Sequence, residues 1–136
     1  MKAKKLISLF CVVACVFSMM MLPVSARASD QIDDYLVEVK SEDGQIYINF
    51  SVSGTGTMDL IGCESIFIYD RNSGRLVESF DENDDGMSRS NTFRYANMIS
   101  ADCEVGTRYK VKVTIFAEDS AGRDTRSQTF YVTGQA

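Results

Sequence analysis

One segment of the 136-residue chain carries oxygen-bearing side chains at a spacing suited to a metal ion. Asp81-Glu82-Asn83-Asp84-Asp85-Gly86 contains the pattern Asp-x-Asn-x-Asp-Gly. Alternate oxygens at this spacing converge on one calcium ion, and the glycine permits the sharp turn that such a loop requires. The candidate ligands are the side chains of Asp81, Asn83 and Asp85, followed by the main-chain carbonyl of Met87.

The second half of this segment departs from a complete calcium loop of the EF-hand type. Arg89 stands at the ninth position, where it adds positive charge, and Thr92 stands at the twelfth, where a bidentate glutamate is expected. Two interpretations therefore remain open: a loop that binds calcium with modest affinity, and an acidic, solvated hairpin loop. No other cofactor is expected.

The side chains needed for hydrolytic catalysis are scarce. The chain has no histidine, which removes Ser-His-Asp and Cys-His arrangements and the commonest general base. Paired carboxylates cleave glycosides only in a cleft that holds them at a defined separation, and a small domain has little volume for one. We therefore expect no enzymatic activity.

The first 28 residues have the layout of a secretory signal peptide. Lysines near the N-terminus precede an apolar run over residues 6–22, and Ala26-Arg27-Ala28 supplies small residues for cleavage. We expect cleavage after Ala28, which leaves a single domain at residues 29–136 with no membrane span. Lipidation at Cys15 is a less favoured alternative, because the mature chain would then begin with apolar residues. Retention of the run as an uncleaved anchor is another.

Cleavage makes the chain distinctly acidic. The whole sequence has 14 basic and 19 acidic residues, and loss of four basic residues leaves 10 against 19, a net charge of −9. Nucleic acids and anionic membranes are bound by clustered lysine and arginine, so neither is expected as a partner. The expected product is secreted and lies outside the cell or in the cell envelope.

Only Cys63 and Cys103 remain after cleavage. In an exported chain we expect them to form one disulfide, closing a loop of about 40 residues and stabilising the domain by roughly 4 kcal/mol. Two free thiols and an intermolecular bond are the alternatives. A zinc site is disfavoured because two thiols without histidine make an incomplete ligand set.

The periodicity of residues 29–136 is that of β-strands. Apolar and mostly polar residues alternate over 109–117 and 46–52, and turn-forming residues separate the segments. Seven short strands in about 100 residues predict an all-β fold, an antiparallel sandwich. The expected strands are 35–40, 46–52, 65–70, 76–80, 91–98, 109–117 and 124–132.

Residues 103–113, Cys-Glu-Val-Gly-Thr-Arg-Tyr-Lys-Val-Lys-Val, resemble the fibronectin type III family of immunoglobulin-like domains through Gly106-Thr107-x-Tyr109 and the alternating strand that follows. The resemblance implies that Tyr109 is a structural tyrosine-corner residue, its ring buried and its hydroxyl bonded to the backbone a few residues upstream. It also implies that Cys103 takes the place of a buried leucine, from which its sulfur could meet Cys63 across the core. More loosely, the chain resembles small secreted proteins of Gram-positive bacteria.

Aromatic and basic residues occupy outward positions of the expected third and sixth strands. Phe67, Tyr69 and Phe116 would share one sheet face with Lys110 and Lys112. Aromatic anchors beside cations suit an acidic or saccharide partner, whereas ordinary cross-strand pairing explains the same residues without one.

The expected function is therefore a small secreted, non-catalytic module for binding or adhesion, whose partner is an extracellular or cell-envelope protein or glycan. The alternative is a structural cell-envelope protein, stabilised by calcium, with no dedicated ligand.

Overall fold

The computed structural model describes residues 30–136; the expected signal peptide at 1–28, with Cys15, lies outside them. The described chain is all β, without a helix, so no part of it forms a helix long and apolar enough to cross a membrane. The strands are β1 (Ile32–Glu42), β2 (Gln45–Asp70), β3 (Leu76–Asp81), β4 (Ser88–Asp102), β5 (Arg108–Asp119) and β6 (Gly122–Thr133).

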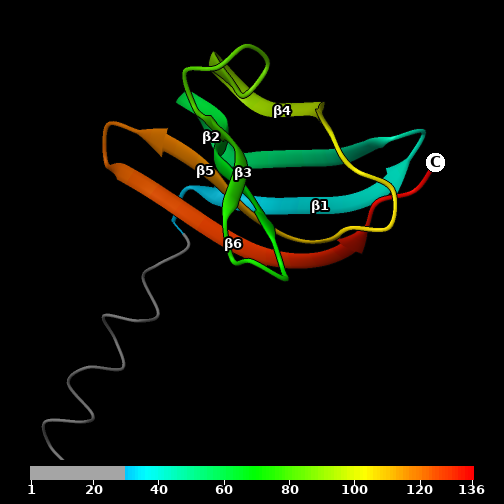
Figure 1. Ribbon diagram of the computed structural model, residues 1–136. Helices are drawn as coiled ribbons and strands as arrows, with labels where there is room; N and C mark the ends of the chain where they lie inside the picture. The colour runs from blue at the N-terminus through cyan, green and yellow to red at the C-terminus, as the bar shows by residue number, and fades with distance from the viewer. Residues whose placement is uncertain (1–29) are drawn as a thin grey trace, which may run out of the picture.

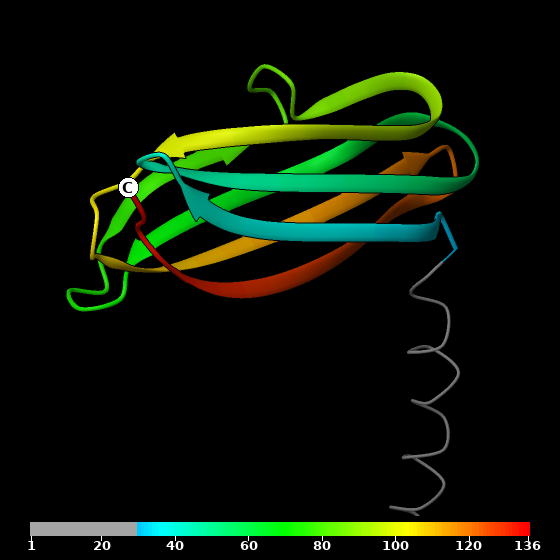
Figure 2. The same cartoon turned by 90° about the vertical axis from the view of Figure 1, so that its right-hand side faces the viewer.

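The longest strand, β2, takes part in both halves of one curled antiparallel sheet (Figure 1). The first half of its 26 residues pairs with β1 and β4, the pairing with β4 continues to Gly62, and the second half also pairs with β3 and β5. β6 continues the sheet beyond β5. In Figure 2, β1 and β4 lie on one side of the molecule and β5 and β6 on the other, so the sheet encloses the core between its two halves.

The expected number of seven strands is wrong, because the described residues form six. Segments 46–52 and 65–70, expected as separate strands, are both parts of β2. The intervening residues 53–57 stay extended and produce only a register shift between Ser53 and Met58 in the pairing with β4. The chain curls back here while staying extended, so the two halves of β2 run in opposite directions across the molecule (Figure 2). The other five expected strands all lie within observed strands.

The alternating pattern buries one side of each strand in a shared core. Most fully buried side chains come from both halves of β2 and from β5, and each large one stabilises the fold by roughly 2 kcal/mol on transfer from water. Phe50 joins this core and packs against Tyr95 of β4, with 5.8 Å between ring centroids. The central members are Ile46, Ile48, Val52, Ile61, Ile66, Ile68, Val111, Val113 and Ile115.

The expected disulfide is absent, and Cys63 and Cys103 are free thiols. Cys63 lies in β2 opposite Ile115 of β5. Cys103 follows β4, with its sulfur 3.6 Å from Ser41 Oγ, and lines the same cavity as Tyr109. Six residues separate Tyr109 from Ile115, about 20 Å along an extended strand. A disulfide requires Cα atoms within about 7 Å, so the two cysteines lie too far apart to pair.

Tyr109 fixes the connection between β4 and β5. Its ring is 4% exposed, and its hydroxyl accepts the N–H of Glu104 at 2.8 Å. These are the buried ring and the upstream backbone bond that the resemblance to fibronectin type III domains implies. The bond holds the connection against the start of β5.

Candidate functional site

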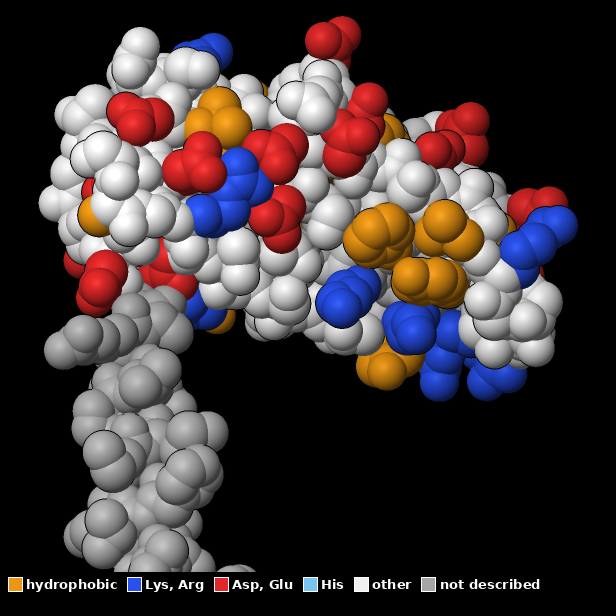
Figure 3. Space-filling model, turned by 90° about the vertical axis from the view of Figure 1, so that its left-hand side faces the viewer, with side chains coloured by type: hydrophobic (Ala, Val, Ile, Leu, Met, Phe, Trp, Pro, Cys, Tyr) orange, Lys and Arg blue, Asp and Glu red, His pale blue; other side chains and the backbone are white. Residues whose placement is uncertain are grey.

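The outer surface of strands β3, β2, β5 and β6 carries ordered rows of side chains. Directly opposite residues of antiparallel strands point to the same side of a sheet, so the register defines these rows. One row contains Leu76, Tyr69, Lys110 and Tyr131, and the next contains Ser79, Phe67, Lys112 and Thr129. We use the name aromatic–basic face for Phe67, Tyr69, Arg71, Lys110, Lys112 and Tyr131. Figure 3 shows hydrophobic and basic side chains gathered at one end of this side of the molecule.

Cations stack on the tyrosines of the aromatic–basic face. Lys110 Nζ lies 4.7 Å from the ring centroid of Tyr69, and the guanidinium carbon of Arg71 lies 4.6 Å from that of Tyr131. The rings of Phe67 and Tyr69 are neighbours, with centroids 6.4 Å apart. Tyr131 is nevertheless 60% exposed. These contacts hold rings and charges in place before any ligand arrives, which lowers the entropic cost of binding.

The β2–β3 turn places Arg71 on this face. The N–H of Arg71 donates to the carbonyl of Arg108 at 2.9 Å, and the Arg108 guanidinium donates to Asn72 Oδ1 at 2.9 Å. Gly74 completes the turn with a φ of +71°, which only glycine adopts without strain. The turn is therefore anchored to the beginning of β5, beside Lys110.

A shallow hollow of about 170 Å³ opens on the aromatic–basic face. The carboxylate of Asp70 accepts the N–H groups of Asn72 and Ser73, at 2.8 and 3.3 Å, and is thus committed to the turn. Two cations and one engaged carboxylate leave the hollow with net positive charge, which suits a ligand anion. Its lining residues are Tyr69, Asp70, Arg71, Gly74 and Lys110.

Phe116, expected to belong to the partner face, is fully buried, and that expectation is corrected. Alternation along β5 does place it on the same side as Lys110 and Lys112. However, the guanidinium carbon of Arg123 lies 4.2 Å from its ring centroid and covers it. Phe116 therefore cannot contact a partner.

Arg123 is the centre of an ion-pair cluster that the sequence alone did not reveal. It binds Glu64 of β2 at 2.9 Å, Glu82 of the β3–β4 loop at 2.9 Å and Glu118 of β5 at 3.1 Å. The hydrogen bond with Arg123 lowers the pKa of Glu82, and the same bond is the largest of those that raise the pKa of Arg123. Figure 3 shows a basic side chain ringed by acidic ones at the end away from the aromatic–basic face. The cluster ties the loop to the sheet.

The candidate calcium loop is internally hydrogen-bonded. Asp81 Oδ1 accepts the N–H of Asn83 at 2.8 Å, and Asp84 Oδ2 accepts the N–H of Asp81 at 2.8 Å. Met87 is buried, and its carbonyl accepts the N–H of Cys63 at 2.7 Å. Within residues 30–136, no group of three or more Asp, Glu, Cys or His side chains is placed to hold a metal ion.

Calcium binding by Asp81, Asn83 and Asp85 stays a prediction. Tight binding to the folded state alone would raise the melting temperature in about 1 mM calcium relative to a chelator, by mass action. The double substitution Asp81→Ala with Asp85→Ala should abolish that rise.

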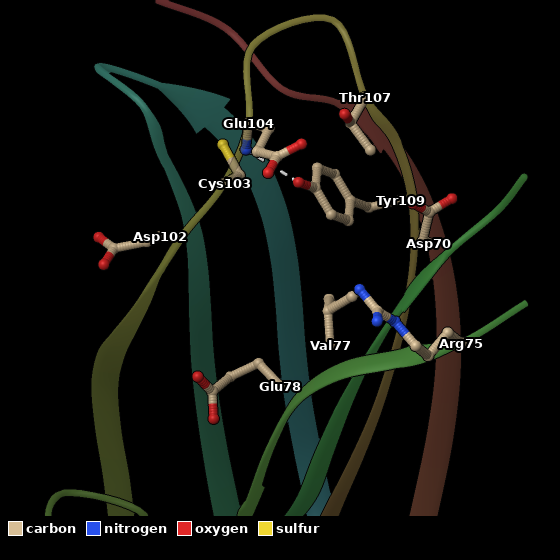
Figure 4. Close-up of a pocket in the computed structure, with 9 residues that line it drawn as sticks. All are labelled: Asp70, Arg75, Val77, Glu78, Asp102, Cys103, Glu104, Thr107 and Tyr109. Carbon is tan, nitrogen blue, oxygen red and sulfur yellow. Dashed lines mark hydrogen bonds between the residues drawn. The ribbon is translucent and has the colours of Figure 1, made fainter. Parts of the chain in front are cut away.

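A second cavity, of about 340 Å³, opens at the end of the sheet near the β4–β5 connection (Figure 4). The hydroxyl of Tyr109 is already engaged with Glu104 there. The exposed carboxylates of Glu78 and Asp102 point away from the tyrosine ring in this view. The lining residues of this cavity are Asp70, Arg75, Val77, Glu78, Asp102, Cys103, Glu104, Thr107 and Tyr109.

No protein-family model and no curated protein sequence matches the chain. Among solved structures, the putative ApaA protein from Bordetella pertussis is 11% identical, with a TM-score of 0.49 over 77% of this chain and 96% of its own. A hypothetical protein from Pyrococcus horikoshii is 12% identical, with a TM-score of 0.43 over 73% of this chain and 87% of its own. A family 76 glycoside hydrolase from a bovine Bacteroides thetaiotaomicron strain is 15% identical, with a TM-score of 0.43 over 78% of this chain but 20% of its own. Similarities of this size imply nothing about function.

Proposed function

We propose that the chain is a secreted, non-catalytic binding module of the immunoglobulin-like or fibronectin type III-like sandwich type, and that an anionic ligand contacts its aromatic–basic face. The observation that carries the proposal is the concentration of positive charge on this face. Three of the ten basic residues between positions 30 and 136 belong to it, Arg71, Lys110 and Lys112, and Arg108 lies beside them at the start of β5. Within an acidic chain, such a concentration creates a surface that attracts an anion.

The exposed rings add a second source of binding energy. Tyr131 is largely exposed, and Phe67 and Tyr69 are half-buried. Aromatic side chains with adjacent cations supply much of the energy at binding surfaces, because each covers a large area and loses little conformational entropy. A structural cell-envelope protein has no need to leave these groups uncovered.

Two features support the sandwich and secretion parts of the proposal. If the two halves of β2 are counted separately, the pairing gives one layer of β1, β2 and β4 and another of β3, β2, β5 and β6. Seven segments in this order, together with the tyrosine corner, suit the immunoglobulin-like class. The N-terminal 28 residues have the layout of an export signal.

Retention on an immobilised polyanion such as dextran sulfate tests the proposal. At low ionic strength the purified chain should be retained despite its net negative charge, and rising salt should release it. Lys112→Glu should abolish retention. Lys40→Glu is the matched control, because Lys40 is an exposed lysine of β1, on the other half of the sheet. Failure of the unsubstituted chain to be retained, or equal loss in both variants, would overturn the proposal.

A further inference from the structure

The centre of the aromatic–basic face is charged. Lys110 and Lys112 occupy the middle of the two rows, and the rings of Tyr69, Phe67 and Tyr131 lie on either side of them. Protein–protein interfaces show the reverse arrangement, with apolar groups in the centre, few lysines there and a polar rim. A charged centre between rings instead suits a ligand that carries anionic groups and flat apolar patches along its own length.

The spacing of Tyr69 and Tyr131 suits a ligand that contacts both rings. Tyr69 of β2 and Tyr131 of β6 each lie one strand away from Lys110 of β5. Two strand spacings place their positions about 10 Å apart. A tyrosine ring offers an apolar face with a polar tip, which matches the C–H face and the hydroxyl edge of a sugar ring.

Hydroxyl side chains border the cations. Ser79 and Thr129 complete the row of Lys112, and both are exposed. Hydroxyls both donate and accept hydrogen bonds, so they can pair with the hydroxyls of a sugar. Aromatic rings, cations and hydroxyls therefore lie next to one another on this face. The hollow among them is shallow rather than enclosed.

We infer that the ligand of the aromatic–basic face is an acidic polysaccharide, whose sugar rings lie on the tyrosines and whose anionic groups pair with Lys110, Lys112 and Arg71. This inference rests on the proposed function and adds the class of ligand to it.

The test compares the purified chain with three soluble polymers at one ionic strength: polygalacturonate, poly-L-glutamate and neutral dextran. Polygalacturonate should bind roughly tenfold more tightly than poly-L-glutamate, and dextran should not bind measurably. Tyr131→Ala should lower the affinity for polygalacturonate roughly tenfold and leave that for poly-L-glutamate nearly unchanged. Tyr131→Phe, which keeps the ring, should retain most of the binding. Tyr35→Ala is the matched control, because Tyr35 is an exposed tyrosine of β1.

The outcomes separate the two proposals. Equal affinity for both polyanions, lost in Lys112→Glu, would retain the binding module and overturn the polysaccharide as its ligand. An unchanged affinity of Tyr131→Ala for polygalacturonate would do the same. Absence of binding to either polyanion would overturn both.

Discussion

At the scale of single residues, Gly62 is a position that tolerates little change. Its φ of +151° is one that side-chain-bearing residues rarely adopt, and an added Cβ would lie 2.3 Å from the carbonyl oxygen of Met87. The close approach lets the N–H of the next residue, Cys63, donate to that carbonyl. Gly62→Ala should therefore destabilise the fold by about 3 kcal/mol or more, measured by chemical denaturation. Gly56→Ala, at a site with open space around it, should be nearly neutral; similar losses in both would contradict this explanation.

The two thiols should differ in reactivity. Burial raises the pKa of Cys63 to about 12, from an ordinary value of 9.0, whereas Cys103 is partly exposed. After removal of residues 1–28, the native protein should therefore react with a thiol reagent at one site, lost in Cys103→Ser, and the denatured protein at two. Because the thiol is kept neutral only in the folded state, stability should fall as the pH rises from about 9 towards 12. A denatured, unreduced protein without reactive thiols would instead show that the disulfide forms.

Residue patterns predicted which side of a strand a side chain occupies, but not what covers it. The alternation over 109–117 correctly separated buried Val111 and Val113 from outward Lys110 and Lys112. It also placed Phe116 outward, and the error arose because Arg123 lies over the ring from the neighbouring strand. Contacts of this kind depend on register between strands, which the sequence does not specify by itself.

At the scale of elements, the Arg123 cluster holds the β3–β4 loop to the sheet. Arg123→Ala should destabilise the protein by roughly 1–2 kcal/mol at pH 7, because three glutamates lose their shared partner. Lys40→Ala is the control, since Lys40 is exposed and forms one exposed ion pair, with Glu42 at 3.3 Å. It should change stability by less than about 0.5 kcal/mol.

The pH dependence of the unfolding free energy provides a second test of the Arg123 cluster. The pKa of Glu82 is lowered in the folded state, so its pairing with Arg123 stabilises the fold fully when the pH is above the ordinary pKa of 4.5. This stabilisation is lost as the pH falls and the Glu82 carboxylate is protonated. The difference in unfolding free energy between the wild-type protein and Arg123→Ala should therefore narrow below about pH 4. A difference that stays constant between pH 7 and pH 3 would mean that the arginine acts through its packing on Phe116 alone.

The positions of the strands were easier to predict than their number. Residues 53–57, with Gly54 and Gly56, curl the chain back within one continuous extended strand, so two of the seven expected strands form a single one. Glycine permits both a turn and an extended bend, so composition alone does not distinguish them. The predicted disulfide was wrong for a related reason. The number of cysteines indicated a pair, but the sequence did not show that Cys63 lies opposite Ile115 of β5 and Cys103 near Tyr109 at the start of that strand.

At the scale of the whole molecule, protection from hydrogen exchange should be unequal. β2 pairs with four of the other five strands, whereas β3 pairs with β2 alone and has mostly exposed side chains. Amides of residues 46–52 and 61–68 should exchange most slowly, and those of 76–81 markedly faster, in exchange followed by mass spectrometry. Equal protection of β3 and β2 would show that the sheet opens only as one unit.

The continuity of β2 also affects the order in which the sheet can be completed during synthesis. Its first half meets β1 as soon as residue 52 has been made, but its second half lacks its partner β5 until residues 108–119 follow. Until then Ile61, Ile66 and Ile68 have no core to enter. A growing chain therefore leaves these isoleucines without their β5 neighbours until residues 108–119 have been made, and this part of the core is completed only then.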